Sequence, residues 1–225
     1  MCGRFVLMSP GKLLAERLEL EEKPDLEPRY NIAPSQPVPV IRVISYRREL
    51  SMLRWGLIPF WAKDPKIGYK MINARSESVG EKPAFRSAFR QRRCLILADG
   101  FYEWDRSKKP KRPYLFRMKD EKPFAFAGLW EHWQGAEGDT IESCTILTTD
   151  ANDLVAALHD RMPVILSPGH YASWIDPDQK NPEMLRELLV PYPADEMEAY
   201  PVTTKVNKPT YDEPDCITPS TATML

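Results

Sequence analysis

Cys2, directly after the initiator methionine, has the most distinctive chemistry in this chain. Its small side chain permits removal of Met1, which would leave an N-terminal residue carrying both a free amine and a thiol. An α-amine has an ordinary pKa of about 7.7–8.0, far below the value of about 10.4 for lysine, so part of it is neutral at pH 7. A neutral amine attacks an aldehyde to give a Schiff base, and the thiol can then close a five-membered thiazolidine. The alternative is that Cys2 merely packs in a buried first strand.

Three further polar residues lie in short, distinctive settings and could assist such chemistry. Glu103 lies between Tyr102 and Trp104, and apolar surroundings can raise the pKa of a carboxyl group into the range of a general acid or base. His159 titrates near neutral pH, and Asn73 offers an amide hydrogen bond. Each also has a plain structural alternative: an exposed strand residue, a histidine at a helix C-terminus and a turn residue.

Positive charge is concentrated in the middle of the chain. Residues 40–119 contain 20 Lys and Arg against 7 Asp and Glu, whereas the rest contains 11 against 25, and the net charge is -1. The same segment contains Phe60, Trp61 and Trp104, and a cationic groove with aromatic platforms is typical of proteins that bind single-stranded nucleic acid. The alternatives are a surface that pairs with the acidic remainder and aromatic side chains that pack in the core, as we expect for Trp55.

The composition is that of a globular protein, with 43% hydrophobic and 28% charged residues. No apolar run approaches the roughly 20 residues that span a bilayer, and the N-terminus lacks the apolar segment of a secretory signal. We therefore expect a cytoplasmic monomer. The four cysteines are far apart and form no C-x-x-C pair, so the sequence predicts neither a zinc site nor a disulfide framework, and no metal or cofactor.

The elements that must position these residues are mostly short strands. The 22 prolines against 10 glycines disfavour a helical bundle. Strands are predicted over 38–46, 50–55, 94–98, 113–118, 123–129, 141–148 and 197–203, with a loop over 55–64. Helices are predicted from Ser9-Pro10 to about 18 and over 83–92, 151–158, 168–174 and 182–189.

Strands and helices do not alternate regularly in this order, which makes a doubly wound parallel sheet improbable. The pattern predicts an α+β fold with a mainly antiparallel, barrel-like sheet and several short flanking helices. We expect a single domain over residues 1–225, with a flexible tail from about residue 208.

Six segments in order resemble the SRAP (SOS-response-associated peptidase) family. They are MCGRF at the N-terminus, RYNIAPSQ (29–36), WGLIPFWAKD (55–64), INARSES (72–78), ADGFYEW (98–104) and LHDRMPVIL (158–166). The resemblance extends from Cys2 to about Tyr200 and is closest to the compact bacterial members, which include abasic-site crosslinking proteins. It implies recognition of abasic sites in single-stranded DNA, association with the nucleoid when DNA is bound, and covalent capping through Cys2 after removal of Met1.

The resemblance also implies a role for each residue of the site. Cys2 would be the covalent nucleophile, Glu103 would hold and deprotonate the α-amine, His159 would assist opening of the sugar ring, and Asn73 would orient the reacting groups. Three arginines would hold phosphates, a proline and three aromatic residues would pack against flanking bases, and a threonine would line the pocket: Arg4, Arg75, Arg161, Pro34, Phe60, Trp61, Trp104 and Thr148.

Two other functions are compatible with parts of this pattern. A thiol peptidase or autopeptidase could use Cys2 with Glu103 and His159. A non-catalytic reader of modified or single-stranded DNA would explain the basic, aromatic middle of the chain but gives Cys2 no task. A protein–DNA adduct that resists denaturation distinguishes crosslinking from both.

Overall fold

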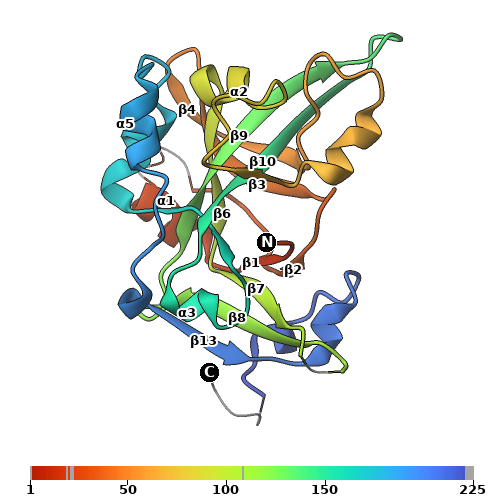
Figure 1. Ribbon diagram of the computed structural model, residues 1–225, viewed down its shortest axis with the longest axis vertical. Coiled ribbons are helices and arrows are strands. Elements are labelled where there is room, and N and C mark those ends of the chain that lie inside the picture. The colour runs from red at the N-terminus through yellow and green to blue at the C-terminus, as the bar shows by residue number, and fades with distance from the viewer. Residues whose placement is uncertain (1, 19, 21–22, 108, 221–225) are drawn as a thin grey trace.

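The computed structural model describes residues 2–18, 20, 23–107 and 109–220. Their strands form two sheets (Figure 1). The smaller sheet has five strands, all paired antiparallel, in the order β13-β8-β7-β1-β2. These strands are β1 (Phe5–Leu7), β2 (Arg29–Ile32), β7 (Gly100–Asp105), β8 (Arg112–Met118) and β13 (Met197–Pro201).

The larger sheet closes on itself as a five-stranded barrel. Its path runs β10-β4-β3-β6-β9, and β9 pairs again with β10. Pairing is antiparallel except where β10 meets β4 and β5, so the mainly antiparallel, barrel-like α+β fold predicted from the sequence is confirmed. The strands of this sheet are β3 (Pro37–Ile44), β4 (Arg47–Trp55), β5 (Asn73–Arg75), β6 (Arg93–Ala98), β9 (Phe124–Gln134), β10 (Thr140–Asp150), β11 (Arg161–Pro163) and β12 (Ile165–Leu166).

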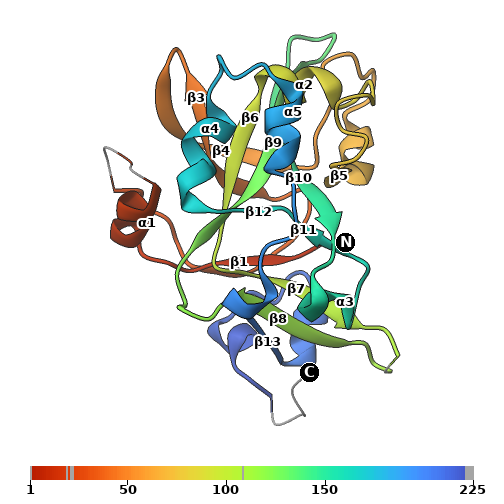
Figure 2. The same ribbon diagram turned by 60° about the vertical axis from the view of Figure 1, so that its left-hand side comes forward.

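Short helices flank the sheets. The α-helices are α1 (Gly11–Leu18), α2 (Arg86–Gln91), α3 (Asp153–Ala156), α4 (Tyr171–Ile175) and α5 (Pro182–Glu187). The 3₁₀ turns are η1 (Pro65–Lys70), η2 (Pro168–His170), η3 (Ala194–Glu196), η4 (Thr204–Asn207) and η5 (Pro214–Ile217). In Figure 2, α2 and α4 lie beside the barrel strands β6 and β9. None of the described helices combines the length and apolar character needed to cross a membrane.

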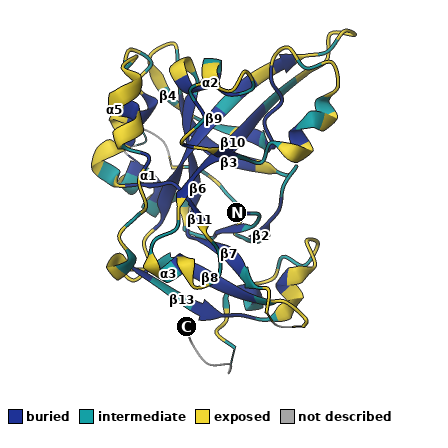
Figure 3. Ribbon diagram, in the orientation of Figure 1, coloured by how far each residue is buried: buried dark blue, intermediate teal, exposed yellow. Residues whose placement is uncertain are grey.

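The hydrophobic core joins the two sheets. The ring of Phe5 on β1 lies 5.2 Å from that of Trp55 on β4 and 5.8 Å from that of Phe126 on β9, both edge to face. All three side chains are fully buried, and Figure 3 shows buried strands at the centre with exposed helical faces around them. The strand that follows Cys2 is therefore anchored in the core of the molecule, and Trp55 is a core residue as predicted.

Most elements lie close to their predicted bounds, with instructive exceptions. The helix predicted over 151–158 is limited to α3, and the helix predicted over 168–174 is divided into η2 and α4. Strands β1, β2, β5, β7, β11 and β12 were not predicted. Five of these have two to four residues, too few for an alternating pattern to be recognised.

Residues 208–220 make specific contacts rather than forming the flexible tail expected from about residue 208; the last five positions of that expected tail lie outside the described residues. The Asp212 carboxylate accepts hydrogen bonds from the main-chain N–H groups of Tyr30 (2.5 Å) and Asn31 (2.8 Å) and pairs with Arg29. The Asn31 amide donates to the carbonyl of Tyr211 at 2.7 Å. Over 208–220 the chain is held against β2, because a carboxylate and an amide bind main-chain groups that would otherwise lack partners.

Candidate active site and nucleic-acid interface

Cys2 is held on both sides by polar contacts. Its carbonyl accepts a hydrogen bond from Nδ2 of Asn73 at 2.7 Å. Its Sγ lies 3.6 Å from the carbonyl oxygen of Arg4, which also accepts the main-chain N–H of Tyr102 at 3.0 Å. The side chain is fully buried. Burial raises the pKa of the Cys2 thiol far above its usual range, and the charge of Glu103 raises it further, so the resting group is a thiol.

Glu103 on β7 acts electrostatically on both Cys2 and His159. Its side chain is buried, because β7 pairs with β1 through Phe101 and Phe5 and with β8 on the other side. The charge of Glu103 acts on the pKa of both the Cys2 thiol and the His159 imidazole. Cys2, Glu103 and His159 are therefore linked electrostatically through Glu103. The fourth predicted reactive residue, Asn73, binds the carbonyl of Cys2.

His159 lies in the turn after α3, with 15% of its side chain exposed. Burial lowers its pKa, partly opposed by the charge of Glu103, so the neutral ring predominates at pH 7. Its Nδ1 accepts the main-chain N–H of Arg161 at 3.0 Å, which assigns the proton of the neutral ring to Nε2. The same Nδ1 lies 2.8 Å from Asp160, a largely exposed carboxylate that can bind the charged ring instead.

Strand register brings these residues together from distant parts of the chain. Arg75 on β5 pairs in parallel with Thr148 on β10, and Thr148 pairs on its other side with Pro163 on β11. Asn73 and the segment after His159 therefore lie on strands that both pair with β10, one on each side of it. Thr148 is fully buried and its Oγ1 donates to the carbonyl of Ala74 at 3.4 Å, so it supports β5 from within.

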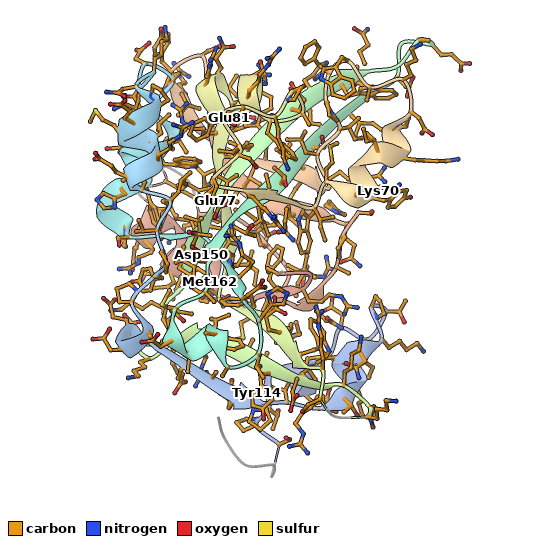
Figure 4. The ribbon with its side chains drawn as sticks, viewed as in Figure 1. Lys70, Glu77, Glu81, Tyr114, Asp150 and Met162 are labelled. Atoms are coloured by element: carbon orange, nitrogen blue, oxygen red, sulfur yellow. The ribbon has the colours of Figure 1, made fainter. Side chains whose placement is uncertain are left out.

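The arginines predicted to bind phosphates differ in their surroundings. Arg161 is only 9% exposed, and its two terminal nitrogens bind the carboxylates of Glu77 and Asp150 and the carbonyl of Thr148. Figure 4 shows Glu77 and Asp150 near each other in the middle of the molecule. Arg75 is exposed and makes no hydrogen bond or ion pair within the described part of the chain. Of the three arginines predicted to bind phosphates, Arg75 alone has no hydrogen bond or ion pair among the described residues, since Arg4 donates to Asn31 and to the carbonyl of Val206.

The predicted stacking residues are also unequal in exposure. Phe60 and Trp61 are 57% and 48% exposed, in the loop between β4 and η1. Pro34 is half-buried in the turn between β2 and β3. Trp104 is half-buried and its Nε1 donates to Oδ1 of Asn207 at 2.6 Å. Phe60 and Trp61 are therefore available for stacking on a base, which is a favourable contact with any nucleobase.

The SOS response associated peptidase (SRAP) family matches residues 1–209 of this sequence. The chain belongs to the SRAP family. Among curated relatives, the abasic site processing protein YoqW of Bacillus subtilis is 47% identical over 96% of this chain and 99% of its own length. The abasic site processing protein HMCES of Xenopus tropicalis is 32% identical over 85% of this chain and 66% of its own length.

Solved structures agree with this SRAP assignment. A protein from Bacteroides thetaiotaomicron has a TM-score of 0.85 with 26% identity, over 97% of this chain and all of its own. A protein from Bordetella bronchiseptica has a TM-score of 0.77 with 30% identity, over 90% of this chain and all of its own. The two-sheet arrangement is thus the fold of this SRAP chain and of both crystal structures.

In this SRAP chain, two residues that the sequence singled out, Arg4 and Trp104, share a pocket with three that it did not. A pocket of about 390 Å³ is lined by Arg4, Trp104, Arg106, Lys111 and Asn207. Arg106 and Lys111 come from the hairpin between β7 and β8, whose basic run R-S-K-K-P-K-R was visible in the sequence. Asn207 had no such signal, because only the folding of η4 against β8 brings it to Trp104.

Proposed function

We propose that this SRAP protein recognises abasic sites in single-stranded DNA and caps them through a covalent bond to Cys2, after removal of Met1. The observation that carries the proposal is that Asn73 binds the carbonyl of Cys2 and that the charge of Glu103 acts on both Cys2 and His159. The names of the curated relatives, which are abasic site processing proteins, support the choice of substrate.

In this proposal the α-amine of Cys2 attacks the aldehyde carbon of the open-chain sugar. Loss of one water gives the imine, the thiol sulfur then adds to the same carbon, and the thiol proton passes to the nitrogen. The product is a thiazolidine, and water is the only molecule released. Glu103 removes a proton from the α-amine before attack. A buried carboxylate suits this task because a fixed charge in a desolvated site acts strongly on a nearby proton.

His159 supplies a proton to the ring oxygen when the closed sugar opens. Because burial lowers its pKa, its protonated form is scarce at pH 7 but is a stronger acid. The hydrogen bond from the main-chain N–H of Arg161 to Nδ1 fixes the ring orientation. Asn73 holds the carbonyl of Cys2 and so orients both reacting groups of that residue.

DNA binding in this proposal depends mainly on Arg75, Phe60 and Trp61, with Arg4, Pro34 and Trp104 on the opposite flank. The family resemblance implies that Arg161 binds a phosphate, but we propose a structural role for it instead. Its ion pairs with Glu77 and Asp150 hold the strand that follows His159. Thr148 likewise contributes support to β5 from its buried position.

The test is incubation of the processed protein with an oligonucleotide that carries one abasic site. We expect an adduct that survives denaturing electrophoresis without borohydride, and an intact mass equal to protein plus DNA minus one water. Cleavage of added peptides without an adduct would instead favour a thiol peptidase. Salt-sensitive binding with no adduct would favour a non-catalytic reader.

A further inference from the structure

We propose that the pocket lined by Arg4, Trp104, Arg106, Lys111 and Asn207 binds a backbone phosphate of the DNA strand on one side of the abasic nucleotide. The segment containing η4 and η5 is, in this proposal, part of the DNA-binding surface. The inference rests on the proposed function and adds to it a defined subsite with three residues, Arg106, Lys111 and Asn207, that the family resemblance did not provide.

Two cations at this pocket have no counterion among the described residues. Arg106 and Lys111 are exposed, and neither side chain makes a hydrogen bond or ion pair within the described residues. The neighbouring Asp105 accepts hydrogen bonds from the main-chain N–H and Oγ–H of Ser107. Two guanidinium groups and an ammonium group, counting Arg4, therefore line a single pocket, an arrangement that attracts a phosphate.

The walls of the pocket are fixed before any ligand binds. Asn207 accepts from Nε1 of Trp104 at 2.6 Å and donates to the carbonyl of Lys111 at 3.1 Å, so one side chain joins the aromatic wall to the basic hairpin. Nη1 of Arg4 donates to Oδ1 of Asn31 at 2.7 Å and to the carbonyl of Val206 at 2.9 Å. Holding both walls in place reduces the entropy lost on binding.

The same contacts hold the C-terminal segment, residues 206–212, against β2. The buried Asn31 amide donates to the carbonyls of Val206, Lys208 and Tyr211, and Asp212 binds main-chain N–H groups of β2. Asn31 thus holds Arg4 with its oxygen and the C-terminal segment with its nitrogen. Loss of these contacts would open the pocket on the side of Asn207.

The pocket lies near the reactive residues along the chain, although Glu103 and Trp104, as consecutive residues of β7, point to opposite faces of the sheet. Arg4 follows Cys2 by two positions and Trp104 follows Glu103 directly, and the charge of Arg106 lowers the pKa of His159. In both Figures 1 and 2 the hairpin joining β7 to β8 and the turn η1 project toward the same side of the molecule. A strand that passes Cys2 and contacts Phe60 and Trp61 near η1 would reach this pocket with its other flank.

The occupant is a phosphodiester of the strand, and a volume of about 390 Å³ exceeds that of a single phosphate, leaving room for part of the sugar. Free inorganic phosphate offers the same chemistry. The two sources differ in affinity, because only a strand also contacts the rest of the surface.

The experiment measures binding to oligonucleotides that carry a tetrahydrofuran, a stable abasic analogue without an aldehyde. One oligonucleotide has flanking nucleotides only 5′ of the analogue and another only 3′. Arg106→Ala/Lys111→Ala is compared with Lys180→Ala, an exposed lysine near α5. We expect the double variant to weaken binding of one oligonucleotide and not the other, and to reduce its salt slope by about 0.7, the contribution of one phosphate on a single strand.

Asn207→Ala sharpens the test because it removes no charge. We expect weaker binding of the same oligonucleotide with an unchanged salt slope and an unchanged melting temperature. Equal losses on both oligonucleotides would indicate a diffuse field and overturn the proposal. Inorganic phosphate that occupies the pocket without weakening binding of the strand would also overturn the proposal. The analogue cannot react, so this assay does not depend on crosslinking. If the pocket binds the strand as expected but a true abasic site forms no adduct, only the proposed function is contradicted.

Discussion

The residues around Cys2 and the cations that flank them are built in opposite ways. Cys2 and Glu103 are buried, and the main chain of Cys2 is held by Asn73, whereas Arg75 and Arg106 are exposed and have no bonds within the described residues. Proton transfer benefits from fixed groups in a desolvated site. Binding a flexible strand instead requires cations that can exchange solvent counterions for phosphates. In the proposed function, the buried residues would set the rate of crosslinking and the exposed arginines would set the affinity for DNA.

The largest effect that can break this comparison comes from Cys2→Ser. Ring closure needs both the amine and the thiol, so the variant should form a Schiff base that borohydride traps but no adduct that persists without it. Denaturing gels with and without borohydride measure both species. A stable, borohydride-independent adduct in Cys2→Ser would refute the thiazolidine.

Glu103→Gln should slow crosslinking by about 10²–10⁴-fold, the usual contribution of general acid–base assistance. DNA affinity should be almost unchanged, because the carboxylate is buried. Part of the rate should return as the pH rises and more of the α-amine becomes neutral unaided. The measurement is the single-turnover rate at saturating protein across a pH series. A variant with the wild-type rate at every pH would make Glu103 a structural residue.

His159→Ala should lose rate within the same range of about 10²–10⁴-fold, without rescue by alkali. In the wild type, the rate should decline as pH rises through the lowered pKa of His159, because the acid form is then lost. The variant should lack that decline. If both proteins show the same alkaline limb, the proton comes from another group.

Arg75→Ala and Arg161→Ala compare a free arginine with a bonded one. Arg75→Ala should weaken DNA binding and lower its salt slope by about 0.7, with little change in the crosslinking rate at saturating protein.

Arg161→Ala should lower the melting temperature, because Glu77 and Asp150 lose their partner. Although partial burial raises the pKa of Glu77, the hydrogen bond from Arg161 lowers it overall. The stabilisation is therefore present above the unfolded pKa of a glutamate, about 4.3, and is lost as pH falls through the lower folded value. Equal stability losses at pH 7 and at acid pH would contradict the ion pair.

The smallest effect connects the two regions. Arg106 lowers the pKa of His159 through space, so Arg106→Ala should raise that pKa. The alkaline limb of the rate profile should then move to higher pH, and added salt should reduce the difference between the two proteins because Arg106 is exposed. An unmoved limb at low salt would show that the pocket and the acid are electrostatically independent.

The sequence was sufficient where local patterns decide the structure. The apolar run from Cys94 to Ala98 predicts β6, and Ser9-Pro10 predicts α1. The sequence was insufficient where residues far apart in the chain determine the pairing of strands. The parallel pairing of β10 with β4 and β5 leaves no periodic pattern in any of these three strands. The predicted loop over residues 55–64 is confirmed from Gly56 onward, because β4 ends at Trp55.

The candidate site shows the same division. Cys2, Glu103 and His159 could be proposed from residue type, because an N-terminal thiol, a carboxyl group among aromatics and a histidine have recognisable chemistry. The ion pairs of Arg161 could not, since Glu77 and Asp150 meet it only after β10 and β11 pair. An arginine in a motif can be a ligand or a support, and only its partners distinguish the two.

The position of β1 has a consequence for when the protein becomes competent to react. Chain ends usually fray, but β1 is paired on both sides, with β2 and with β7, and Cys2 is fully buried. An aminopeptidase needs an extended, accessible terminus in its own active site. In the proposed mechanism, methionine removal therefore belongs to the nascent chain on the ribosome, before β1 is inserted between its neighbours. Once folded, the same strand pairing would shield the mature terminus from further trimming.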